Sequence, residues 1–262
     1  MLDGVRVLLC IIFLIYASWS DFKTREVSNW VWAIFAPLAL ILTSLQFFIF
    51  TPELLQGYVL SFAATSALSI TLFYAGAFGG ADAKAFICLS LALPFYPTDI
   101  LQPYSSVISP LSQMLFTITV FSNAVLSAAL SVIYIVSHNY LWKYKTGKRL
   151  FEGVEKESKW RKTLVLLSGY KVDIAELEKK EHLYPLEDFD ENERKLLVVP
   201  KDEDREEIVG RLQKAKQEGR LQNGVWATPG LPMLIFVTIG LIVALVYGDI
   251  VWVIVRSALG YS

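Results

Sequence analysis

The chain has 262 residues, 54% of them hydrophobic, and a formal net charge of −1 at pH 7. Its mean hydropathy of +0.46 is high for a soluble domain, and the near-zero net charge argues against a nucleic-acid partner. We therefore expect an all-α polytopic membrane protein that is embedded in a lipid bilayer.

Six apolar segments are candidate transmembrane helices, because about 20 apolar residues span roughly 30 Å of hydrocarbon. They lie at 5–20, 30–50, 54–74, 83–95, 113–136 and 232–247. The fourth is short, and the sixth could continue to Val255. The first resembles a signal peptide, but the bulky Trp19 makes "ASWS" a poor cleavage site, so we expect a retained helix.

A charged insert separates the fifth and sixth candidate helices. Residues 138–228 hold 19 of the 24 Lys and Arg and 18 of the 25 Asp and Glu. Within it, "TLVLLSGYKV" (163–172) and "KLLVV" (195–199) predict strands, and 202–220 predicts an amphipathic helix. We expect five membrane helices in 1–137, a small cytoplasmic α+β domain in 138–228, and the sixth helix with an extracytoplasmic tail in 229–262.

The distribution of basic residues predicts the orientation, because Lys and Arg are enriched in cytoplasmic loops. The loops at 21–29 and 75–84 and the start of the insert carry Lys or Arg, whereas 51–53 and 96–112 carry none. This pattern predicts a cytoplasmic insert and extracytoplasmic termini. Arg6 and Arg256, near the two ends, depart from it.

Two aspartates fall on the predicted cytoplasmic side, Asp21 at the end of the first helix and Asp82 at the start of the fourth. Carboxylates in membrane segments are costly and usually face a cavity or a partner. Two carboxylates about 3 Å apart share a proton, so that one activates water while the other protonates a carbonyl. Such a pair can hydrolyse a peptide bond without metal. Gly79 and Gly80 would let an extended peptide lie beside Asp82.

A purely structural role for this loop is also open. Gly76 and Gly80 form a GxxxG pattern, which is typical of helix packing. Asp82 could serve only to cap a helix, and Lys84 could extend to the headgroups.

Three motifs in chain order resemble the type IV prepilin peptidases, a branch of the intramembrane aspartyl proteases. "GGAD" at 79–82 is similar to their G-x-(G or apolar)-D motif, and "DFKTREVSN" matches the setting of the first aspartate at Asp21, Thr24, Val27 and Asn29. "TPGLPMLIF" at 228–236 resembles their closing proline-glycine-proline segment. The insert between helices 5 and 6 resembles the arrangement of archaeal preflagellin (archaellin) peptidases.

The resemblance implies a catalytic pair of Asp21 and Asp82, with a substrate groove at Gly79, Gly80, Pro229, Gly230 and Pro232. Its substrates would be preflagellin or type IV pilin-like precursors, cut after a short basic leader at the cytoplasmic membrane face. Bacterial prepilin peptidases generally carry a cysteine tetrad and N-methylate their product. This chain has only Cys10 and Cys88, so we expect no metal, no cofactor and no methyl transfer.

Other functions stay open at this point. The same chemistry could act on archaeal prepilins or on pilin-like binding-protein precursors. A proton-coupled transporter could use the two aspartates as a relay, and a membrane scaffold could act through its insert. The acidic runs at 187–193 and 202–207 could capture a basic leader, or could simply be solvated surface.

Overall fold

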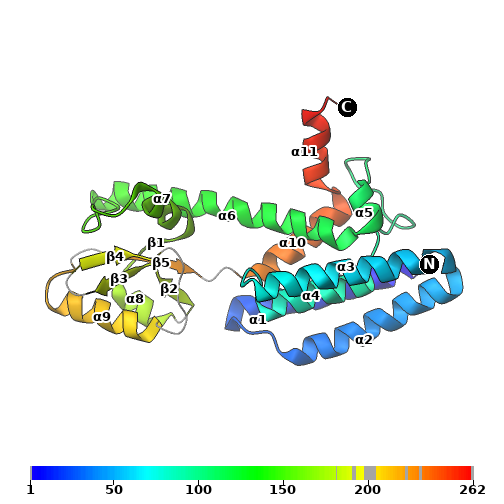
Figure 1. Cartoon of the computed structure of the whole chain (residues 1–262), viewed down its shortest axis with the longest axis horizontal. Coiled ribbons are helices and arrows are strands. Elements are labelled where there is room, and N and C mark those ends of the chain that lie inside the picture. Colours follow the sequence, from blue (N-terminus) through cyan, green and yellow to red (C-terminus); the bar gives the residue numbers. More distant parts are fainter. Residues whose placement is uncertain are drawn as a thin grey trace. The chain divides into compact units, whose positions relative to one another are not determined.

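The computed structural model describes residues 2–180, 182–190, 193–197, 205–221, 224–229 and 232–260. The chain forms two compact units, shown with their elements in Figure 1. The helical unit comprises Met1–Ala128 and Pro232–Ser262, and the α+β unit comprises Ala129–Leu231. The charge pattern of the sequence predicts an inserted domain at 138–228, whereas the α+β unit of the structure spans Ala129–Leu231. Helix α6 (Phe116–Thr146) begins in the first unit and ends in the second.

The helical unit is built from apolar helices around one core. Its elements are α1 (Asp3–Thr24), α2 (Asn29–Leu45), the π-helical turn η1 (Gln46–Phe50), the 3₁₀ turn η2 (Pro52–Leu54), α3 (Leu55–Tyr74), α4 (Gly80–Ala92), α5 (Pro110–Met114), the start of α6, α10 (Met233–Val246) and α11 (Ile250–Ala258).

Helix α4 lies at the centre of this unit and packs against α1, α2, α3 and α10 (Figure 1). Eight of its 13 residues are buried. At 1.5 Å per residue it is about 20 Å long, too short to cross roughly 30 Å of hydrocarbon. The expected fourth span at 83–95 is therefore not confirmed as a full-length span. The segment is apolar because other helices enclose it.

Four described helices are long and apolar enough to cross a membrane, namely those at Asp3–Thr24, Asn29–Phe50, Pro52–Tyr74 and Phe116–Thr146. A fifth span is possible if α10 and α11, which bend by 59° at their junction, count together. The bend falls at Gly248, whose φ of 107° suits glycine, and at Asp249, which accepts the Trp252 N–H to begin α11. These helices support a membrane protein, but the expected count of six is not reproduced.

The position of Arg6 explains one departure from the basic-residue pattern. Arg6 is only 6% exposed, forms an ion pair with Asp3, and lies over the ring of Phe47 at 5.6 Å. Its charge is thus compensated inside the helical unit and does not lie in a loop.

The α+β unit has a separate core. Beyond the end of α6 it contains α7 (Lys159–Ser168), β1 (Tyr170–Val172), α8 (Ile174–Lys179), β2 (Leu183–Pro185), β3 (Glu187–Asp190), β4 (Glu193–Leu196), α9 (Arg205–Gln217) and β5 (Val225–Pro229). Strand β5 pairs antiparallel with both β1 and β2, in the order β1-β5-β2, and β3 and β4 form a separate antiparallel pair.

The expected strand at 163–172 is mostly wrong. Residues up to Ser168 belong to helix α7, and only Tyr170–Val172 is a strand. A short apolar run does not distinguish helix from strand by periodicity alone, and here Gly169 separates the two elements.

The other two elements predicted in the insert are present in the structure at least in part. The expected strand at 195–199 lies partly in β4, and 198–199 fall outside the described residues. The expected helix at 202–220 is confirmed as α9, with Ile208, Leu212 and Ala215 buried; its first three expected residues are not described.

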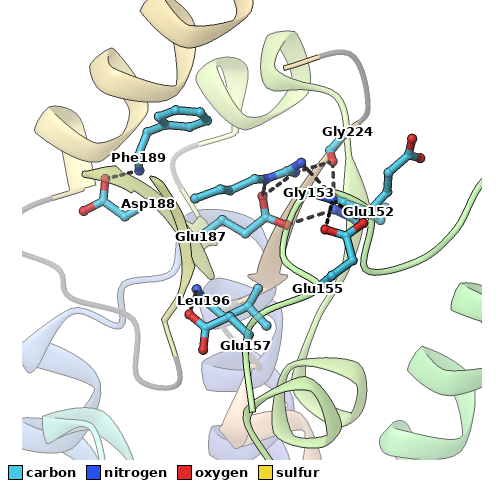
Figure 2. Close-up of polar contacts among 11 residues, drawn as sticks. Glu152, Gly153, Glu155, Glu157, Glu187, Asp188, Phe189, Leu196 and Gly224 are labelled. Atoms are coloured by element: carbon cyan, nitrogen blue, oxygen red, sulfur yellow. Dashed lines mark hydrogen bonds and ion pairs between the residues drawn. The ribbon is translucent and has the colours of Figure 1, made fainter. Parts of the chain in front are cut away.

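A buried charge cluster connects the parts of the α+β unit. The side chain of Glu187 is fully buried and accepts from Lys171 Nζ at 2.9 Å and from Arg194 Nε at 2.7 Å. Lys171 also donates to the Gly224 carbonyl at 3.0 Å, and Arg194 to the Glu152 carbonyl at 3.1 Å. Figure 2 shows Glu187 facing Gly224 and Glu152. The cluster therefore joins β1, the β3–β4 pair and the segment that follows α6.

The ion pairs of Glu187 and Asp188 bear on the hypothesis that the acidic runs at 187–193 and 202–207 capture a basic leader. Glu187 is buried within the cluster, and Asp188 accepts two hydrogen bonds from Arg211, at 2.9 and 2.7 Å. Glu187 is therefore not accessible to a leader peptide, and Asp188 is already paired within the unit; capture by the acidic runs stays a prediction. Residues 191–192 and 202–204 lie outside the described residues.

Burial lowers the pKa of Lys171 from 10.5 to about 8, although the Glu187 carboxylate opposes this shift. Between these two pH values the unfolded chain holds a proton that the folded chain has released. We therefore expect the α+β unit to become more stable as pH rises from about 8 to about 10.5, by at most ~3 kcal/mol. Unfolding measured across this range should lose that slope in Lys171→Met; a slope that the variant retains would contradict this origin.

Candidate active site

Asp21 lies in the last turn of α1 and is half-buried. Its carboxylate lies within hydrogen-bonding range of the Leu234 backbone N–H, and the charge of Arg25 acts on it. Leu234 is the second residue of α10, where backbone N–H groups have no partner within the helix. The carboxylate is therefore held at the N-terminal end of α10, where a negative charge is favoured.

Two hydroxyls hold α1 and α10 together next to Asp21. Ser18 Oγ donates to the Leu234 carbonyl at 2.8 Å and lies 2.7 Å from Thr238 Oγ1. Thr238 Oγ1 also donates to the Leu14 carbonyl at 3.3 Å. These residues were not predicted from the sequence. Ser18 lies three residues before Asp21 on the same face of α1, and that spacing is the signal that could have indicated it. Thr238 belongs to α10, and no spacing along the chain connects it to Asp21.

The loop after Asp21 is shaped by its own side chains. The Arg25 N–H donates to the Asp21 carbonyl at 3.0 Å, and Arg25 adopts a positive φ of 59°. Ser20 Oγ and Thr24 Oγ1 both donate to the Glu26 carbonyl, at 2.8 and 3.0 Å. The threonine of the "DFKTREVSN" motif therefore closes the turn that follows the aspartate.

Asp82 lies in the first turn of α4, behind Gly79 as the N-cap residue. Its Oδ2 accepts the Gly79 N–H at 3.0 Å, as an acidic side chain does at this position of a capping box. Asp82 is half-buried, whereas Gly79 is exposed. The capping role weighed from the sequence is thus present, and it places the Asp82 carboxylate at a second helix N-terminus.

The three glycines before Asp82 have different structural roles. Gly76 has a φ of +72° and nothing near its missing Cβ, so it serves a turn and does not pack one helix on another. A Cβ on Gly79 would lie 3.1 Å from Asp82 Oδ2, whereas a Cβ on Gly80 would make ordinary contact with Phe73 at 3.7 Å. Because Gly79 has no Cβ, the Asp82 carboxylate can keep its position beside it.

Gly79→Ala is accordingly expected to lower kcat/KM for precursor cleavage by about tenfold, because a small displacement of a reacting group is costly. Gly80→Ala, the matched control, should behave nearly as the parent chain does. Equal losses in both variants would point to a peptide groove that needs both glycines, as the sequence alone suggests.

The structure brings Asp21 and Asp82 to one end of the helical unit. Helices α1 and α4 are in contact, and the charge of Asp21 acts on Asp82. Two carboxyl groups are thus presented near each other: Asp82 lies in the first turn of α4, and Asp21, from the last turn of α1, lies at the N-terminal end of α10. Such a pair can accept a proton from water and return one to a substrate carbonyl.

The other predicted site residues are placed differently. Pro232 directly precedes α10, two residues before Leu234, and belongs to the helical unit. Pro229 ends β5, pairs with Leu183, and belongs to the α+β unit. Gly230 lies outside the described residues. The substrate groove expected at these three residues therefore stays a prediction.

Within the described part of the chain, no group of three or more His, Cys, Asp or Glu side chains is arranged to hold a metal ion. Cys10 and Cys88 are free thiols, 0% and 3% exposed, inside α1 and α4. Buried cysteines of this kind behave as small apolar residues.

Comparison with known proteins matches both parts of the chain to peptidase families. Residues 8–137 match the model of the Type IV leader peptidase family, and residues 161–250 match that of the Archaeal Peptidase A24 C-terminus Type II. The first match includes both Asp21 and Asp82.

Curated relatives are similar over nearly their whole length. The chain is 26% identical to a preflagellin peptidase of Methanococcus voltae, over 90% of this chain and 92% of the relative. It is 25% identical to one of Methanocaldococcus jannaschii, over 94% and 95%, and 24% identical to one of Methanococcus maripaludis, over 90% and 92%. With both parts of the chain matched, this protein belongs to the type IV leader peptidase family.

Proposed function

We propose that this chain is an aspartic endopeptidase that removes the short basic leader from preflagellin-type precursors. The observation that supports this most strongly is the contact of helix α1, whose last turn carries Asp21, with helix α4, whose first turn carries Asp82. The names of the curated relatives supply the substrate class.

In this mechanism the two carboxyl groups share one proton when a substrate peptide is bound. The ionised member draws a proton from a water molecule, which attacks the scissile carbonyl. The protonated member donates its proton to the carbonyl oxygen and regains one when the resulting gem-diol collapses, while the carboxyl that took the proton from water passes it to the leaving amine. The N-terminal ends of α4 and α10 stabilise the negative charge of the pair. Neither a metal ion nor a covalent intermediate is needed.

The proposed reaction takes place at the cytoplasmic face of the membrane. Lys23, Arg25 and Lys84 lie beside the two aspartates in the chain, and such basic residues favour the cytoplasmic side. A precursor with a basic leader and a following apolar helix would be held on the same side. The exposed Gly79 leaves room for its extended backbone next to Asp82.

Purified protein incubated with a preflagellin precursor in detergent or vesicles tests the proposal. We expect a shortened product whose mass corresponds to a cut after the leader, with no added methyl group. EDTA and serine- or cysteine-directed reagents should leave the rate unchanged. Loss of activity with EDTA that zinc restores would contradict the aspartic mechanism. Absence of any cleavage would contradict the peptidase function and favour a proton relay or a scaffold. A prepilin precursor in the same assay measures substrate preference.

A further inference from the structure

A hydrogen bond joins the two loop motifs that carry the aspartates. Lys84 Nζ donates to Asn29 Oδ1 at 2.7 Å, across 55 residues of sequence. Lys84 lies two residues after Asp82 in α4, and Asn29 is the first residue of α2. The bond therefore ties the start of α4 to the start of α2, which follows α1 after a short loop.

Hydrogen bonds within the segment from Asp21 to Asn29 hold its conformation, so the position of Asn29 is coupled to that of Asp21. The Arg25 N–H and the hydroxyls of Ser20 and Thr24 fix its first half, as described above. Ser28 caps the next helix, accepting the Trp30 N–H at 3.4 Å. Asn29 is thus fixed relative to Asp21 by short, local contacts.

Asp82 is similarly fixed relative to Lys84, since both lie in the first two turns of α4 and Asp82 is bonded to Gly79. The covalent chain from Asn29 to Lys84 and the Lys84–Asn29 bond together close a ring that contains Asp82. Asp21 lies outside this ring and is joined to it at Asn29 by the short segment described above. A change in the bond would let the first turn of α4 shift relative to the end of α1. Such a shift changes the separation of the two carboxyl groups.

We propose that Lys84 and Asn29 are positioning residues, whose hydrogen bond sets the spacing of Asp21 and Asp82. This inference rests on the proposed function of the two aspartates. Both side chains are exposed, so the bond contributes little to the stability of the buried helices. Its effect on the rate is larger, because a displacement of about 1 Å in a reacting group can cost about a hundredfold.

The test compares Lys84→Met, Asn29→Leu and their double variant with a matched loss of charge, Lys23→Met. Lys23 is exposed in the last turn of α1, with its Nζ 5.0 Å from the Trp19 ring. We expect each single variant to lower kcat by about tenfold with KM little changed, and the double variant to lose no more than either single variant. Lys23→Met should keep the parental rate. Asn29→Asp, which keeps the bond as an ion pair, should retain activity.

Hydrogen exchange provides a readout that does not depend on catalysis. In Lys84→Met and Asn29→Leu, the amides at the starts of α2 and α4 should exchange faster, while those of the central part of α4 should not change. Unchanged exchange at these positions would overturn the inference whether or not the protein cleaves a precursor.

Kinetics separate the remaining outcomes. Additive losses in the double variant, or a rise in KM with Lys84→Met alone, would show that Lys84 acts on the substrate and not through Asn29. An equal loss of kcat in Lys23→Met would show that the loss comes from removing a positive charge and not from breaking the Lys84–Asn29 bond. Each of these results overturns the positioning role, whereas a parent chain that cleaves nothing contradicts the proposed function instead.

Discussion

Asp21→Asn and Asp82→Asn are each expected to lower precursor cleavage by at least about a thousandfold, because each removes a group that must gain or lose a proton in the reaction. Asparagine has nearly the same volume as aspartate and still accepts a hydrogen bond. The contacts from the Leu234 and Gly79 N–H groups can therefore persist. The measurement is kcat/KM for leader removal, with the product identified by mass.

Asp99→Asn is the matched control, because Asp99 is exposed in the loop after α4. It should cleave at the parental rate. All three variants should remain inserted and show parental hydrogen exchange in α4. Near-normal cleavage by either dyad variant, in a protein that folds normally, would contradict the aspartic mechanism.

Glu187→Gln is expected to have the largest effect on stability. The substitution removes the carboxylate that pairs with both Lys171 and Arg194 and leaves two cations in a site where their side chains are 1% and 8% exposed. Breaking a buried ion pair in this way is costly, here by about 3 kcal/mol near pH 7. Hydrogen exchange of the β1 and β5 amides in the full chain should accelerate by roughly a hundredfold.

Glu176→Gln provides the comparison for this prediction. Glu176 pairs with Lys180 within one helical stretch, and both side chains are 46% exposed. Exposed pairs of this kind contribute little, so exchange in β1 and β5 should be unchanged. If Glu187→Gln also left exchange unchanged, the buried cluster would not be what holds the sheet to the β3–β4 pair.

The sequence predicts the long, largely exposed apolar helices well and predicts less well a short helix that other helices cover. Long runs such as α1, α2 and α3 are recognisable by length and composition. Helix α4 has the same composition for a different reason, since it is enclosed by protein, and composition does not separate these cases. The helix at 163–168 was predicted as a strand because its apolar run is too short to show a period.

The sequence predicts the two aspartates of the candidate site, but it predicts less well the groups that hold them in position. Asp21 and Asp82 stand out because carboxylates are rare in apolar segments. The Leu234 N–H, the Thr238 hydroxyl and the Lys84–Asn29 bond depend on which helices pack together, and no local pattern encodes that. Pro229 and Pro232 lie close in sequence, yet they belong to different units.

The central claim is that Asp21 and Asp82 act together on one substrate, and cross-linking tests it most directly. Cysteines placed at 21 and 82, in a chain whose Cys10 and Cys88 are replaced by alanine, would be treated with a short bifunctional thiol reagent with and without a precursor. Cysteines at 29 and 84, whose native side chains are in contact at 2.7 Å, serve as the positive control. The account predicts that the 21–82 pair cross-links and that bound precursor increases the yield. A control pair that cross-links while the 21–82 pair fails to do so, with and without precursor, would contradict it.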